Sequence, residues 1–255
     1  MTLVLVVTAL LLGMAAKGLT LFDQSKADQL LLQVRQMESL MNEYKRTHHR
    51  WPGDCDGNGQ IDSSMTDFVG AIAENARSIR AEHFEFTATS PVASSESVNG
   101  DPAVAGNACP IALPTVHSGE LTPTVASGFN VPYNDLKLAG LLSVAQPNRI
   151  AAMHAAGDFM AMTKLGLGSP LSGSDPYFNA IVLFNVSVSF SRKLAVALDG
   201  FDGAEAYKGR LRRIRVSGDG FETSWVNNSG VTNETQDSLI NVAYFFDQMP
   251  LPQTY

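Results

Sequence analysis

The sequence predicts an α+β fold in which one long amino-terminal α-helix packs on a globular head with a mainly antiparallel β-sheet. Two observations lead to this prediction. An apolar and then periodic segment runs without a proline through residues 1–44, and short segments with strand-like alternation follow one another in the second half of the 255-residue chain. Because these strands are joined by short links and one helix, we expect them to pair antiparallel.

The first half of the predicted helix, residues 1–22, is apolar. Residues 1–16 carry no charged side chain, and after Lys17 the apolar character resumes at Gly18. At a rise of 1.5 Å per residue this segment is about 33 Å long, which is enough to cross a hydrocarbon core of about 30 Å. We therefore expect residues 1–22 to form a helix that can lie in a membrane or in an apolar filament core.

The second half, residues 23–50, has one apolar stripe. Leu30, Val34, Met37, Met41 and Tyr44 recur at spacings of four and three, as on one face of a continuing helix. This half needs a globular partner along one side only. We expect that partner to be the head domain, residues 51–255.

Composition and the two cysteines are typical of an exported protein. The chain is 45% hydrophobic and 17% charged, and its net charge of −7 gives no reason to expect specific nucleic-acid binding. Cys55 and Cys109 could form one disulfide, which would contribute about 4 kcal/mol by closing a loop of about 55 residues. The alternative is two separate buried thiols.

A candidate calcium loop follows the long helix. Oxygen side chains stand at its first, third, fifth and ninth positions, with glycine at the sixth and a backbone carbonyl at the seventh, as in the front of an EF-hand loop. The twelfth position is Met65, so a bidentate carboxylate is available only if Asp67 reaches back. The alternative is a polar turn stabilised by Asx and Gly residues. The predicted ligands are Asp54, Asp56, Asn58, the Gln60 carbonyl, Asp62 and Asp67.

Further elements follow in order. The apolar spacing at 66–79 predicts a short amphipathic helix. Residues 87–132 are rich in Ser, Thr and Pro, and this composition predicts an irregular surface excursion. Helices are predicted at 134–143 and 192–198, and strands at 158–165, 178–189, 210–216 and 239–246.

The predicted strand at 210–216 carries a basic cluster that begins at Lys208. Strand alternation places Arg210 and Arg212 on one side and Arg213 and Arg215 on the other. We expect a solvated edge strand protected by charge in the isolated subunit, and contacts with neighbouring subunits in a polymer. Motifs for metalloproteases, phosphate-binding loops, haem attachment and serine nucleophiles are absent from the sequence, so we expect no enzymatic activity.

Several stretches together resemble one protein family. They are Met1-Thr2-Leu3-Val4, Gly13, Trp51-Pro52-Gly53-Asp54, residues 136–141 (LKLAGL) and residues 195–212. In this order they resemble type IV pilins and pseudopilins of the long bacterial prepilin type.

The resemblance implies an assembly segment at the amino terminus. Met1 would be the end produced by a prepilin peptidase, with Thr2, Leu3, Leu5, Gly13, Lys17 and Gly18 in the segment that polymerises. Family members usually have Glu where Leu5 stands here, and Lys17 is an unusual charge in this half. The missing Glu is less surprising in a minor pilin or a tip pseudopilin than in a major subunit.

The function implied is that of a structural subunit of an extracellular filament. Its partners would be copies of itself in a helical homopolymer, the pilus assembly machinery and the prepilin peptidase. The protein would lie in the bacterial inner membrane before assembly and on the cell surface afterwards. The alternatives are a minor pilin or type II secretion tip pseudopilin, and a monomeric, membrane-anchored adhesive module that binds calcium.

Overall fold

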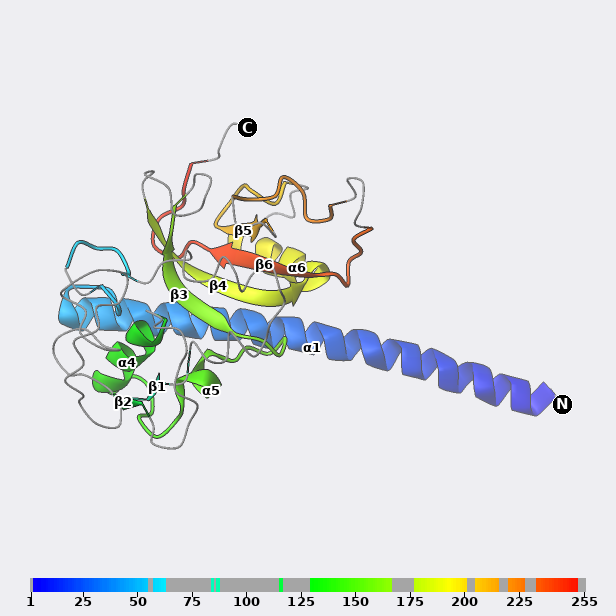
Figure 1. Ribbon diagram of the computed structural model, residues 1–255. Coiled ribbons are helices and arrows are strands. Elements are labelled where there is room, and N and C mark those ends of the chain that lie inside the picture. The colour runs from blue at the N-terminus through cyan, green and yellow to red at the C-terminus, as the bar shows by residue number, and fades with distance from the viewer. Residues whose placement is uncertain are drawn as a thin grey trace.

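A four-stranded antiparallel sheet and one long helix organise the protein (Figure 1). The computed structural model describes residues 2–54, 57–62, 84, 86–87, 115–116, 129–166, 177–200, 205–215, 220–227 and 233–251. The helices are α1 (Thr2–His48), α4 (Asn130–Leu138), α5 (Asn148–Ala152) and α6 (Val188–Asp199). The strands are β1 (Phe86–Thr87), β2 (Thr115–Val116), β3 (Met160–Leu165), β4 (Phe178–Ser187), β5 (Leu211–Ile214) and β6 (Leu239–Tyr244).

The sheet has the strand order β3-β4-β6-β5, and every neighbouring pair is antiparallel. All four of its strands lie within the segments that the sequence predicts, so the α+β class with an antiparallel sheet is confirmed. β4 is bulged opposite β6 between Leu183 and Val186. Asn185 adopts a left-handed backbone (φ 50°) in the bulge, and its N–H donates to the Asn241 side chain at 3.0 Å.

The helix α6 starts earlier than predicted. The segment at 178–189 reads as one strand by composition, but β4 ends at Ser187, whose hydroxyl caps α6 by accepting from Phe190 N–H. The helix ends at Gly200, which adopts φ 81° and donates to the Val196 carbonyl. The cap explains why the helix already includes Val188 and Ser189, which were predicted as the end of the strand, and the two residues that follow them.

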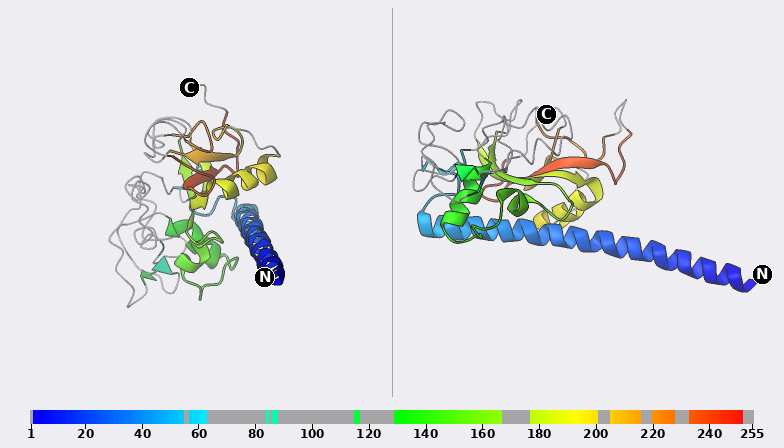
Figure 2. Two further views of the ribbon diagram at one scale, coloured as in Figure 1. Left: turned by 90° about the vertical axis from the view of Figure 1, so that its right-hand side faces the viewer. Right: turned by 60° about the horizontal axis from the view of Figure 1, so that its bottom comes forward.

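The helix α1 is continuous over 47 residues. It ends where His49 takes a left-handed conformation (φ 59°), and Lys45, Arg46 and His48 in its last turn complement the helix dipole. The amino-terminal half extends away from the rest of the molecule, as Figure 1 and the right-hand view of Figure 2 show. The head therefore lies beside the second half of α1 only.

The core joins that second half to the sheet. All five residues of the predicted stripe, together with Ala27, are buried, and the five belong to the same hydrophobic cluster as the side chains of β3, β4 and β6. In Figure 1 β4, β5, β6 and α6 lie above α1, β3 crosses it, and the region of α4 and α5 lies below it. The predicted helix at 134–143 corresponds to α4, which starts earlier, at Asn130, and ends earlier, at Leu138. The predicted helix at 66–79 and most of the predicted excursion at 87–132 lie outside the described residues.

Candidate functional site

The described part of the predicted calcium loop folds back on itself just after α1. Asp54 is buried, and one of its carboxylate oxygens, Oδ2, accepts a hydrogen bond from Gly59 N–H at 3.0 Å. Asn58 Oδ1 accepts from Gln60 N–H at 2.8 Å, which is an Asx turn. Gly59 has φ 87°, a conformation that favours glycine. The loop is thus closed by its own side chains.

Asn179 of β4 fastens this loop to the sheet. Its Oδ1 accepts from Ile61 N–H at 2.9 Å, and its Nδ2 donates to the Gly59 carbonyl at 2.8 Å and to Asp247 Oδ2 at 2.9 Å. One buried amide therefore satisfies groups from the loop and from the chain after β6.

Asp135 of α4 fastens the other end of the loop. Its Oδ2 accepts from Gly53 N–H at 2.9 Å and pairs with Arg50 at 3.2 Å. A side chain at position 53 would not fit, because a Cβ there would come within 2.7 Å of the Pro132 ring, and φ at Gly53 is 84°. The glycine of the WPGD stretch is therefore required by the contact between the loop and α4.

The fit of calcium to the described residues is partial. Asp54 Oδ2 is already used by Gly59 N–H, and Asp62 Oδ1 lies 3.9 Å from the Lys164 ammonium, which competes with a cation. Across the described ranges, no three Asp, Glu, His or Cys side chains are grouped so that they could hold a metal ion. Asp56, Asp67, Cys55 and Cys109 lie outside those ranges, so the calcium site and the disulfide stay predictions.

The assembly residues of the sequence prediction lie on α1. Thr2, Leu3, Leu5, Gly13, Lys17 and Gly18 all belong to the unbroken helix, and Met1 lies outside the described residues. The side chains of α1 are described from Gln24 onward. Within the residues whose side chains are described, no helix is long and apolar enough to cross a membrane.

The basic strand differs from the prediction. Arg212 and Arg213 are 0% and 1% exposed, so the expectation that they are solvated in the isolated subunit is wrong for these two, whereas the expected contacts in a polymer stay a prediction. β5 is the last strand of the sheet, but its outer side is covered by hydrogen bonds from Arg213 N–H to the Ala206 carbonyl and from Glu222 N–H to the Arg213 carbonyl. Arg210 and Arg215 are half-buried and remain candidates for subunit contacts.

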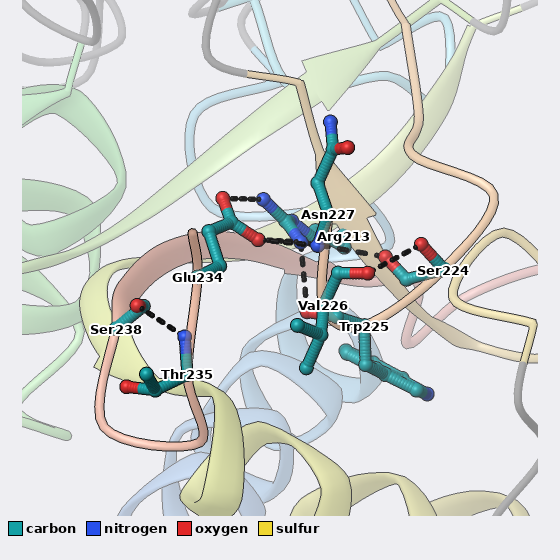
Figure 3. A network of polar contacts seen from close by, with 8 residues as sticks. All are labelled: Arg213, Ser224, Trp225, Val226, Asn227, Glu234, Thr235 and Ser238. Carbon is teal, nitrogen blue, oxygen red and sulfur yellow. Dashed lines mark hydrogen bonds and ion pairs between the residues drawn. The ribbon is translucent and has the colours of Figure 1, made fainter. Parts of the chain in front are cut away.

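Arg213 is the centre of a buried polar network (Figure 3). Its guanidinium binds Glu234 through two nitrogens, at 2.8 and 2.5 Å, and donates to the Trp225 carbonyl at 2.7 Å. Glu234 also accepts from Asn227 N–H at 2.6 Å. Burial by itself would raise the pKa of Glu234, but the hydrogen bonds from Arg213 and Asn227 outweigh it, and that pKa lies below its usual range.

Arg212 points to the other side of β5. Its guanidinium lies over the rings of Phe221 and Phe245, with 5.7 and 5.4 Å to the ring centroids. It also donates to the carbonyls of Gly209 and Pro250. The alternation predicted for the strand is therefore right, but both sides are covered by segments that are distant in sequence.

Lys137 of α4 is a buried lysine that sequence reasoning did not single out. It is 1% exposed, and its ammonium donates to the Gln146 carbonyl at 2.5 Å. Burial lowers the pKa of Lys137 to about 8. Asp135, Asn179 and Glu234 were also missed, since each is a single polar residue whose partners lie far away in the sequence.

Comparison of the chain with known protein families, with characterised proteins and with solved structures finds no match.

Proposed function

We propose that this protein is the structural subunit of an extracellular filament that resembles a type IV pilus, and that copies polymerise through the amino-terminal half of α1. The proposal includes calcium as a ligand of the loop after α1. It also includes the partners that such assembly requires, namely other copies, the assembly machinery, the prepilin peptidase and the inner membrane.

The attachment of the head supports this proposal. The stripe from Ala27 to Tyr44 is buried, whereas Gln24, Asp28 and Gln29 on other faces of α1 are exposed. A helix with one buried face belongs to the surface of a globular domain. The head thus uses the second half of α1 as one of its own elements.

The observation that carries the proposal is the direction of the first half. α1 continues without a break to Thr2, and this half extends away from the head (Figure 2). Its sequence has no charged residue before Lys17. A helix that is apolar on all sides needs an apolar environment, which either lipid or other copies of the same helix can supply.

Other copies lead to a filament. When the apolar half of one subunit packs against a different surface of the next subunit, the contact is heterologous and does not close into a ring. The same contact then repeats along a helical polymer. Before assembly, lipid would provide the apolar environment that this half of the helix needs.

Electron microscopy of surface filaments sheared from cells, with mass spectrometry of their protein, tests the proposal. We expect filaments that contain this chain as the main component. Filaments made mainly of another protein, with this chain at low abundance, would identify a minor subunit. A protein that stays in the membrane fraction of cells without filaments would contradict the proposal and favour an anchored module.

A pair of substitutions separates assembly from folding. Val7→Lys adds a charge to the apolar half, and Ser39→Lys adds the same charge to an exposed position of the second half. We expect Val7→Lys to abolish filaments and Ser39→Lys to preserve them. A truncated chain beginning at Gln24 should fold without polymerising, and filaments formed by that truncated chain would refute the role of the first half.

A further inference from the structure

The loop after α1 contains an Asn-Gly pair, Asn58-Gly59, that is exposed to solvent. In such a pair the backbone nitrogen of the glycine can attack the side-chain carbonyl carbon of the asparagine, because glycine has no side chain to obstruct the approach. A Cβ at position 59 would meet no described atom within 4 Å, so the loop leaves room around this peptide. The hydrogen bonds of the two residues decide whether the fold promotes this attack.

The carboxylate of Asp54 is placed to take the proton from the attacking nitrogen. Its Oδ2 accepts the Gly59 N–H at 3.0 Å, which is within the reach that general-base catalysis requires. Asp54 is 1% exposed, and its backbone carbonyl is held by the Arg50 guanidinium at 2.8 Å. A backbone N–H is a very weak acid, so the attack depends on a base at this position. The fold thus supplies a base that a free Asn-Gly peptide lacks.

The side-chain carbonyl of Asn58 is polarised by a second backbone group. Its Oδ1 accepts from Gln60 N–H at 2.8 Å. When a nitrogen adds to this carbonyl, negative charge develops on Oδ1, and a donor that already points at the oxygen stabilises that charge. The same Asx turn keeps the side chain folded back over the backbone that follows it. The base, the nucleophile, the electrophile and the oxyanion donor therefore all lie within residues 54–60.

We propose that this loop catalyses the cyclisation and deamidation of its own Asn58. The Gly59 nitrogen loses its proton to Asp54 Oδ2 and forms a bond to Asn58 Cγ. The bond from Cγ to the side-chain nitrogen then breaks, and that nitrogen takes the proton back from Asp54 and leaves as ammonia. Water opens the resulting succinimide at either carbonyl, which yields aspartate or isoaspartate at position 58. This modification goes beyond the proposed function and does not depend on it, because all the groups belong to one loop of one chain.

The rate of deamidation in the full chain tests this inference. The purified chain is incubated in detergent, with and without concentrated urea, and peptide mass spectrometry follows the succinimide and its two products. We expect Asn58 to react at least about tenfold faster in the folded chain than in urea, since a positioned general base contributes about 100-fold or more. A second pair, Asn99-Gly100, lies outside the described residues and serves as the internal reference between variants.

Two substitutions identify the base. Asp54→Asn keeps an oxygen that can accept the Gly59 N–H but cannot take its proton, so it should lower the Asn58 rate about tenfold in the folded chain and leave the Asn99 rate unchanged. Asp62→Asn, which removes another buried carboxylate of the same loop, should leave both rates unchanged.

Three results would overturn the inference. If Asn58 of the parent reacts no faster in the folded chain than in urea, the fold does not promote the reaction, and this comparison holds even where Asp54→Asn fails to fold. An unchanged Asn58 rate in folded Asp54→Asn would exclude Asp54 as the base. An equal loss in Asp54→Asn and Asp62→Asn would show that the loop acts through its shape and not through the Asp54 carboxylate.

Discussion

Replacing Glu234 with Gln should destabilise the head, because Arg213 would remain buried without its counter-charge. Arg213 is 1% exposed, and two of its nitrogens lie 2.8 and 2.5 Å from the Glu234 carboxylate. Removing one partner of a buried ion pair costs about 3–5 kcal/mol. The Glu234 side chain keeps 15% exposure, so we take the lower end, about 3 kcal/mol.

The melting temperature measures this loss. For a protein of this size each kcal/mol lowers Tm by about 2–4 °C, so Glu234→Gln should lower it by about 6–12 °C. Tryptophan fluorescence of the full chain in detergent suits the assay, because the chain has two tryptophans and both, Trp51 and Trp225, lie in the head.

A matched control is the exposed pair of Glu205 and Lys208, whose charged atoms are also 2.5 Å apart. Glu205→Gln should shift Tm by less than about 2 °C, since solvent screens an exposed pair. Equal effects of the two substitutions would refute the argument that burial makes the Arg213 pair important.

The effect should also depend on pH. The pKa of Glu234 is lowered in the folded state, so its contribution to stability is present above the pKa of an unfolded Glu and is lost as pH falls through the folded value. The difference in Tm between the parent and Glu234→Gln should be constant above about pH 5 and should shrink below about pH 4. A difference that persists unchanged at pH 2 would contradict the assigned charge state.

Three further predictions concern the head. The parent should gain stability between about pH 8 and pH 10, and Lys137→Met should remove this gain. The reason is that Lys137 has a pKa of about 8 in the folded state, whereas in the unfolded chain the lysine stays protonated to higher pH. Parallel profiles of Tm against pH for parent and variant would contradict this. Asn179→Ala should cost about 2 kcal/mol by leaving buried loop groups without their partner, and urea unfolding should show a much smaller loss for Asn58→Ala, whose Asx turn is exposed. Calcium in millimolar excess should raise Tm relative to chelator, and Asp56→Ala should abolish that shift; an unchanged parent Tm would leave the loop as an ordinary turn.

Local periodicity explains what could be predicted about the fold. The spacing of Leu30, Val34 and Met37 identified the face of α1 that is buried, and alternation with β-branched residues located all four strands of the sheet. Both patterns follow from the repeat of a single helix or strand, so the residues of that element are enough to predict them. The start of α6 was missed because the apolar residues of β4 continue into Val188, so the pattern alone gives no sign that the strand ends and that Ser187 caps a helix.

The sequence by itself determined the long helix, its two halves and the positions of the four strands, because each of these depends on neighbouring residues. Only the tertiary structure decided that Arg212 and Arg213 are buried and that Asp135 and Asn179 hold the loop after α1. Strand alternation tells on which side Arg213 points, but not that residues 224–227 and Glu234 cover that side. Whether a side chain is covered depends on segments far apart in the chain. A buried charge needs hydrogen-bond and ion-pair partners to offset its desolvation, and no local pattern shows which residues these partners are.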